Sequence, residues 1–163
     1  MTAKNALLDA LAPLTRLIAT LDLSQPSMAV DALDQATTPQ MRKVLEEMLI
    51  EGHAEGWLTP RGGVPEGVYF GRLAKPSEET AGLSIDAVDM EGEATEHTHP
   101  LGEVSFCVAR EGEPRFDGHP PGWVVLPPGS HHTPTVEGGR MLIVYFLPDG
   151  AVVWGPQAGA TSP

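Results

Sequence analysis

The chain has a single cysteine, Cys107, among its 163 residues. An internal disulfide is therefore excluded, and so is a zinc cluster built from several thiolates. Basic residues are also scarce: 10 Lys and Arg stand against 22 Asp and Glu, which gives a formal net charge of −12 and an isoelectric point of about 4.7. This charge repels nucleic acids and anionic membranes, so we expect neither as a partner.

Long apolar runs are missing as well. No stretch approaches the roughly 18 apolar residues of a membrane-spanning helix, and the N-terminal segment MTAKNALLDALAPL has no basic region followed by a long apolar core. We therefore expect a cytoplasmic protein. The glycine-rich fingerprints of nicotinamide and flavin binding are also absent, which predicts chemistry that needs neither cofactor.

The first third of the chain shows the spacing of amphipathic helices. Apolar side chains recur at three- and four-residue steps in an N-terminal stripe, Leu7, Leu11, Leu14, Ile18 and Leu21. Pro13 falls inside this stripe and predicts that the helix starts or bends there. A further helix is predicted from the cap Thr38 and Pro39 to a stop at Gly52. We expect the stripe to pack on the rest of the chain or on a second subunit.

From about residue 60 onward, short β-type runs are punctuated by Gly and Pro. These runs are GVYFGRL, GLSIDAVDM, EVSFCVA, GWVVLP and RMLIVYFL, at hairpin-like spacing. The pattern predicts a mainly β fold, a barrel or sandwich over residues 59–155. A helical arm, residues 1–58, precedes it, and a flexible tail, residues 156–163, follows it.

Histidine and glutamate are concentrated in two segments, EHTHPLGE and LPPGSHHTP. Alternate side chains of a strand share a face, so His97 and His99 point the same way, and Glu103 can fold back beside them across a turn. From the second segment His131 or His132 can supply a further ligand, and His132 fits better. Histidines are also common at solvated turns, but the grouping of four of the six in two short segments favours a metal site.

This set of side chains suits a divalent transition metal. Imidazole and carboxylate ligands bind Fe, Mn, Ni, Zn or Cu, and neither a set of thiolates for tetrahedral zinc nor an oxygen cage for calcium is present. If Glu103 points into the barrel, strand alternation predicts that Ser105, Cys107 and Ala109 do so too. We expect Cys107 to be a small buried residue rather than a nucleophile.

The two segments resemble the signature motifs of the cupin superfamily, HxHx3E and PxGxxH, which here read HTHPLGE from His97 and PPGSHH from Pro127. The resemblance implies an antiparallel, jelly-roll type β-barrel with a metal site of three His and one Glu. It implies His132 rather than His131 as the fourth ligand beside His97, His99 and Glu103. The chain departs from the usual pattern with Val136, where an Asn often ends the second motif.

A narrower resemblance covers most of the chain. The helical arm and the segments EHTHPLGEVSFCVA and FDGHPPGWVVLPPGSHHTPTVEGGRMLIVYFLPDGAV are similar to the 4-hydroxylaminobenzoate lyase family. This implies conversion of 4-hydroxylaminobenzoate to 3,4-dihydroxybenzoate (protocatechuate) and ammonia in nitroaromatic degradation, with a Lewis-acidic metal assisting cleavage of the N–O bond. An aromatic carboxylate substrate needs a local cation, and Arg72, Arg115 and Arg140 are the candidates for a bidentate contact.

Two other functions fit the same residues. A cupin dioxygenase acting on a small diketone or aromatic ring would use the same ligands but consume O2. A non-catalytic cupin that binds a small molecule would show no turnover. Because the leucine stripe is longer than a small barrel needs, we expect a homodimer. The sequence leaves open the metal, its catalytic or structural role, and which arginine binds the carboxylate.

Overall fold

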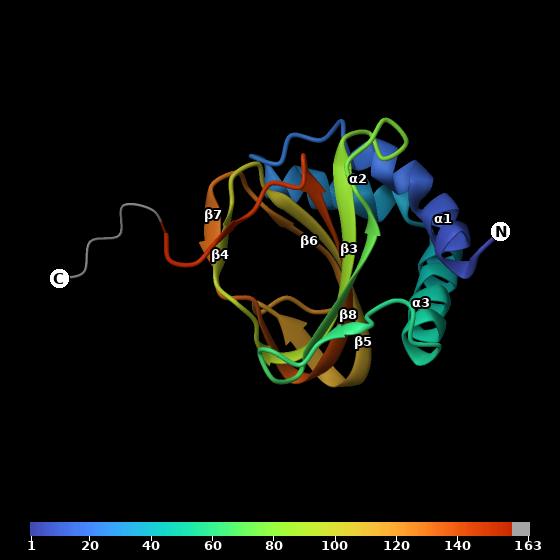
Figure 1. Cartoon of the computed structure of the whole chain (residues 1–163). Coiled ribbons are helices and arrows are strands. Elements are labelled where there is room, and N and C mark those ends of the chain that lie inside the picture. The colour runs from blue at the N-terminus through green and yellow to red at the C-terminus, as the bar shows by residue number, and fades with distance from the viewer. Residues whose placement is uncertain (158–163) are drawn as a thin grey trace.

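The computed structural model describes residues 1–157 (Figure 1). Apart from its first two residues, the predicted tail over 156–163 lies outside the described residues. Three helices come first: α1 Ala3–Ile18, α2 Pro26–Ala36 and α3 Pro39–Ala54. The strands that follow are β1 Arg61–Gly62, β2 Val68–Ala74, β3 Leu83–Glu93, β4 His97–His99, β5 Glu103–Phe116, β6 Gly122–Leu126, β7 Ser130–His132, β8 Thr135–Pro148 and β9 Val153–Trp154.

Helix α1 starts well before Pro13, so the predicted start at that residue is wrong. The Thr2 hydroxyl caps it by accepting a hydrogen bond from the Asn5 N–H at 3.1 Å. An internal proline costs a helix about 3 kcal/mol, whereas each fully buried Leu or Ile contributes about 1.5–3 kcal/mol. Burial of the stripe therefore outweighs the cost of the proline, because four of its side chains are buried: Leu7, Leu11, Leu14 and Ile18.

The sequence pattern does not predict α2, because few of its side chains are buried. Helix α3 begins as predicted, with the Thr38 hydroxyl accepting a hydrogen bond from the Met41 N–H at 3.1 Å. The predicted stop at Gly52 is wrong, since the helix continues to Ala54. A Cβ on Gly52 would lie 2.6 Å from the Trp57 ring, so the glycine lets this indole pack against the helix.

All strand pairs in the described chain are antiparallel. The larger sheet has the order β1-β2-β3-β8-β5-β6, and the smaller sheet has the order β7-β4-β9. The two sheets lie on opposite sides of the barrel, and the helices cover the larger one (Figure 1). The predicted mainly β, cupin-type antiparallel barrel preceded by helices is therefore confirmed.

Alternation along β5 divides the core into two layers. Val104, Phe106 and Val108 belong to a cluster with the buried side chains of all three helices. Cys107 belongs to a second cluster on the barrel side of the sheet. Ala109, expected to face inward, pairs with Met141 of the second cluster but is itself exposed. The leucine stripe of α1 is thus buried within the subunit.

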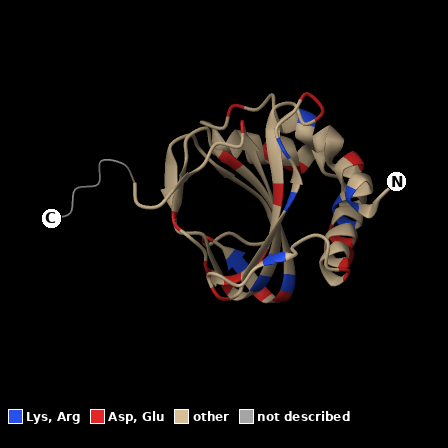
Figure 2. Cartoon of the chain, in the orientation of Figure 1, with Lys and Arg blue, Asp and Glu red and all other residues tan. Residues whose placement is uncertain are grey.

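Charged side chains lie mainly on the helices, the loops and the ends of the longer strands (Figure 2). Strands β4 and β7, which carry the two histidine segments, contain no Lys, Arg, Asp or Glu. In residues 1–157 no helix combines the length and the apolar character needed to cross a bilayer.

Candidate metal centre

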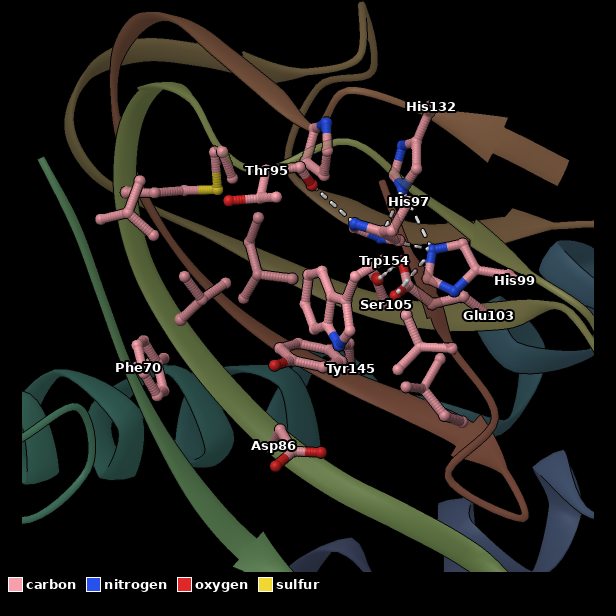
Figure 3. A pocket seen from close by; sticks show the side chains of 18 of the residues that line it. Phe70, Asp86, Thr95, His97, His99, Glu103, Ser105, His132, Tyr145 and Trp154 are labelled. Carbon is pink, nitrogen blue, oxygen red and sulfur yellow. Dashed lines mark hydrogen bonds and ion pairs between the residues drawn. The ribbon is translucent and has the colours of Figure 1, made fainter. Parts of the chain in front are cut away.

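Strands β4 and β7 bring the two histidine segments together. They pair antiparallel, with His97 opposite His132, Thr98 opposite His131 and His99 opposite Ser130. His97, His99 and His132 lie on the face toward the barrel interior, and all three line its cavity (Figure 3). Side chains 33 to 35 positions apart in the sequence thus converge because the strand register is fixed.

The three imidazoles present their Nε2 atoms to one point. The Nε2 atom of His99 lies 3.0 Å from that of His97 and 3.0 Å from that of His132, and the remaining pair is 3.1 Å apart. Three nitrogens that each lie about 2.1 Å from one ion can be separated by about 3 Å, so these atoms are close enough together to bind a single ion.

Hydrogen bonds at the opposite ring nitrogens fix two of these imidazoles. The Nδ1–H of His97 donates to the Thr95 carbonyl at 2.7 Å, and the Nδ1–H of His132 donates to Asp117 Oδ2 at 2.6 Å. Because both partners accept, each Nδ1 carries the proton and each Nε2 keeps its lone pair for a metal. The other oxygen of Asp117 accepts the Thr135 backbone N–H at 2.9 Å.

Burial favours the uncharged form of two of these histidines. It lowers the pKa of His97, and it lowers the pKa of His99 to about 3, with help from the neighbouring histidines. Neutral imidazoles are the form that binds metal. Glu103 Oε2 lies 3.3 Å from His99 Nε2, and Glu103 Oε1 accepts a hydrogen bond from the Ser105 hydroxyl at 3.0 Å. Burial raises the pKa of Glu103 to about 7.

The residues therefore fit a divalent transition metal. The cluster in which every ligating atom lies within 4.8 Å of the others contains His97, His99 and His132. Glu103 adjoins it through His99. Three nitrogens and one carboxylate are the donor set that the sequence predicts. In the described chain, the buried Nδ1 of His99 has no hydrogen-bond partner, so no contact at that nitrogen orients the ring.

His131 lies on the other face of β7. Its Nδ1 is 2.7 Å from the Thr98 hydroxyl, and its Nε2 is 3.0 Å from Glu96 Oε2. The structure thus brings His132 rather than His131 into the cluster. Contacts from Thr98 and Glu96 tie β4 and β7 together behind the three ligating rings.

A cavity of about 490 Å³ extends from the histidines through the barrel. Its volume lies within the range of about 300–1,000 Å³ typical of small-molecule sites. Apolar side chains that line it include Val88, Met90 and Ile143, and exposed aromatic rings of Phe70 and Trp154 lie at its edge (Figure 3). The cavity is therefore suited to an apolar ring with polar substituents.

Of the three predicted arginines, only Arg72 lines this cavity. Arg140 instead contacts Asp89 and Glu91, at 2.8 and 2.9 Å, and the Arg115 guanidinium donates to the Gly118 carbonyl. The interpretation of Arg115 and Arg140 as substrate ligands does not fit these positions.

The sequence assigns no specific role in the site to several cavity and supporting residues, although it leaves Trp154 and Tyr145 among five aromatic residues of which one could flank the cavity. Arg61, Asp86, Tyr145 and Trp154 line the cavity, and Asp117 supports His132. Single residues on separate strands give no local motif, and only the inward alternation of β3 and β8 could have selected Asp86 and Tyr145.

The model of the 4-hydroxylaminobenzoate lyase family, PnbB, matches residues 19–154, a range that includes all four predicted ligands. The chain belongs to this family. The resemblance inferred from the sequence is thereby confirmed.

Two curated members of the family are similar to this chain. The 4-hydroxylaminobenzoate lyase of Pseudomonas putida is 30% identical over 132 residues, which cover 70% of this chain and 74% of the relative. That of Nocardioides sp. (strain LMS-CY) is 35% identical over 89 residues, which cover 50% of this chain and 53% of the relative. The chain therefore matches about half the length of the second relative.

Solved structures similar to the barrel include a cupin protein and a dioxygenase. An RmlC-like cupin protein from Ralstonia eutropha JMP134 has a TM-score of 0.44 and 16% identity, covering 60% of this chain and 65% of that chain. An acetylacetone dioxygenase from Acinetobacter johnsonii has a TM-score of 0.43 and 15% identity, covering 59% of this chain and 68% of that chain.

Proposed function

We propose that the protein is a metal-dependent lyase that converts 4-hydroxylaminobenzoate and water to 3,4-dihydroxybenzoate and ammonia. The observation that carries the proposal is the convergence of His97, His99 and His132 on one point at the wall of a largely apolar cavity. Membership of the 4-hydroxylaminobenzoate lyase family supports the substrate. The donor set of three imidazoles and one carboxylate supports a divalent transition metal such as Fe, Mn, Ni or Zn.

The proposed reaction is redox-neutral overall. The N–O bond breaks heterolytically, its electron pair leaves with oxygen, and protonation releases that oxygen as water. One water adds at the ring carbon ortho to the carbon that bears nitrogen. A second water then displaces the nitrogen as ammonia. The net change consumes one water, because the ring is oxidised while the nitrogen is reduced, so the reaction needs neither O2 nor an added reductant.

Each protein group has a defined part in this scheme. A divalent ion held by His97, His99, Glu103 and His132 would supply Lewis acidity at the hydroxylamine oxygen. Ser105 holds the Glu103 carboxylate by a 3.0 Å hydrogen bond.

The rest of the cavity acts on the ring and its carboxylate. The apolar walls of the cavity hold the ring. Arg72, the only predicted arginine at the cavity, is the cation for the substrate carboxylate.

The proposal is tested by metal analysis and an ammonia assay on the same preparations. Wild-type protein purified without chelator should carry one divalent ion per chain and release ammonia from 4-hydroxylaminobenzoate. His99→Ala should lose both the metal and the activity while its circular dichroism spectrum stays that of a folded β protein. Full metal content and full activity in His99→Ala would refute the proposed site.

The cytoplasmic homodimer predicted from the sequence is part of the proposal. Its first basis, the leucine stripe, is buried within the subunit and is not available to a partner. Exposed apolar side chains on α2 and α3, those of Met28, Val44 and Ile50, remain as a candidate contact surface. Light scattering at micromolar concentration should give twice the 17.3 kDa chain mass, and a monomer mass would refute the dimer.

A further inference from the structure

A row of polar side chains crosses the cavity wall on four adjacent strands. Arg72 on β2 pairs with Asp86 on β3, Asp86 pairs with Tyr145 on β8, and Tyr145 pairs with Ser105 on β5. All four line the cavity. The row ends beside the candidate metal ligands, because the Ser105 hydroxyl donates to Glu103.

The next inward row along the same strands is apolar. In matching register it consists of Phe70, Val88, Ile143 and Cys107. On β2, β3, β8 and β5 one row is therefore polar and the next is apolar, and Arg61 on β1, which pairs with Phe70, adds a charged side chain to the cavity at the edge of the apolar row. A ligand with an apolar body and polar groups at its two ends would match this pattern if it lay along the polar row.

The Tyr145 hydroxyl is an available donor in this row. It makes no hydrogen bond to any of residues 1–157, and Tyr145 is half-buried at the cavity wall, so the hydroxyl is open to a ligand in the cavity. Burial, together with the charges of Asp86 and Glu103, raises the pKa of Tyr145, so the hydroxyl stays protonated. In Figure 3 it points away from the histidines, toward the other end of the cavity.

Arg72 can supply a second donor, but Asp86 partly neutralises its charge. Its Nε–H donates to Asp86 Oδ1 at 2.9 Å, and within the described chain its two terminal nitrogens make no side-chain hydrogen bond. The Arg72 side chain is also 50% exposed, so its attraction for an anion is screened. The Tyr145 hydroxyl is neutral and lies deeper in the cavity than the Arg72 guanidinium. Its contribution to binding the carboxylate is therefore larger than it would be beside a fully effective arginine.

We infer that Tyr145 is a specificity-determining residue that donates its hydroxyl hydrogen to the substrate carboxylate. A terminal nitrogen of Arg72 donates to the other carboxylate oxygen, and Asp86 positions that arginine through its Nε–H. This subsite rests on the proposed function, since it takes the reacting group to lie at the histidines. Neighbouring strands are about 4.8 Å apart, so Arg72 lies three strand intervals from Ser105, and the row favours a para-substituted ring, whose two polar groups are farthest apart.

Binding of inert analogues to the metal-loaded protein tests the inference without turnover. The probes are 4-hydroxybenzoate and 4-methylphenol, which has a methyl group in place of the carboxylate. Isothermal titration calorimetry should show about 10- to 100-fold weaker binding of 4-hydroxybenzoate to Tyr145→Phe, the loss expected for one hydrogen bond to a charged group. Binding of 4-methylphenol should not change.

Tyr69→Phe is the matched control, because Tyr69 is the other tyrosine and does not line the cavity. It should bind both probes as the wild type does, and Arg72→Met should weaken only 4-hydroxybenzoate. Unchanged 4-hydroxybenzoate affinity in Tyr145→Phe overturns the inference, whether or not Arg72→Met weakens it. Equal loss of both probes also overturns it, because that result means a packing role.

The same variants separate this inference from the proposed reaction. In the ammonia assay Tyr145→Phe should raise KM for 4-hydroxylaminobenzoate and change kcat little, because the lost contact is made equally in the ground and transition states. If wild-type protein released no ammonia but bound 4-hydroxybenzoate through Tyr145, the reaction would be refuted and the subsite would stand. If wild-type protein released ammonia but Tyr145→Phe changed neither KM nor the affinity for 4-hydroxybenzoate, the reaction would stand and the subsite would be refuted.

Discussion

Replacing Asp117 by Asn tests whether hydrogen bonding behind the cluster prepares it for metal. Asp117 uses both carboxylate oxygens: Oδ2 accepts from His132 Nδ1 at 2.6 Å, and Oδ1 accepts from the Thr135 backbone N–H at 2.9 Å. Asparagine has one acceptor oxygen and one NH2 group, so it can satisfy only one of these donors. The backbone should tolerate the change, because Asp117 has a φ of 47° and asparagine adopts this left-handed region more readily than most residues.

Both orientations of the new amide weaken the site. If its NH2 group faces His132, that ring must give up its Nδ1 proton and protonate Nε2, which blocks the atom that faces the metal. If the NH2 group faces Thr135, two donors oppose each other and the turn is strained. Such supporting contacts are worth about 10- to 100-fold in metal affinity, which is about 1.4–2.7 kcal/mol.

A competition assay with a fluorescent chelator measures the change in metal affinity. Glu96→Gln is the matched control, because Glu96 makes the same kind of contact, 3.0 Å to a ring nitrogen of His131, outside the cluster. It should leave the affinity unchanged. Equal affinity of Asp117→Asn and wild type would refute the argument from tautomers. Equal losses in both variants would show a general loss of charge rather than a specific contact.

Three further outcomes are expected. His132→Ala should lose most bound metal while His131→Ala keeps it, and metal analysis giving the reverse would place the ligand one residue away. Trp154→Ala should raise KM for the aromatic substrate several-fold with metal retained, since Trp154 lines the cavity and is 64% exposed; an unchanged KM would exclude contact with the ring. Asp89→Asn should lower the free energy of unfolding by about 3 kcal/mol, because buried Asp89 pairs with two arginines. Burial raises the pKa of Asp89, but the hydrogen bonds from these arginines lower it by more, so the net shift is downward. The stabilisation should therefore be complete above the unfolded pKa near 3.8 and should be lost as the pH falls below it. A difference in stability between Asp89→Asn and wild type that persisted in acid would contradict this assignment.

The candidate metal ligands could be predicted from the sequence because their signal is local. His97 and His99 alternate on one strand, and the stiff turn before His132 fixes which ring of the second segment enters. The choice between His131 and His132 depended on strand register, which the motif encodes. The barrel was predictable for a similar reason, since short β-type runs recur at hairpin spacing.

The features of the site that could not be predicted from the sequence depend on contacts between distant elements. The guanidinium group of Arg140 could bind an anion, but Asp89 and Glu91 on the neighbouring strand β3 already neutralise its charge. The regular pairing of β5 with β8 ends just after Ala109 at a register shift, which no residue type in the sequence predicts. Tyr145 joins the cavity wall only through the pairing of β8 with β3 and β5, so its part in the site could not be seen before the strand order was known.

The most direct test of the central claim is an anaerobic reaction in 18O-labelled water. Metal-loaded protein, 4-hydroxylaminobenzoate and no reductant should give ammonia and 3,4-dihydroxybenzoate in equal amounts, with solvent oxygen in the product. This result is predicted because the proposed conversion of the hydroxylamine to a catechol and ammonia is redox-neutral overall and takes its new ring oxygen from water. A strict requirement for O2, with gas-derived oxygen in the product, would contradict the account and place the protein among the dioxygenases.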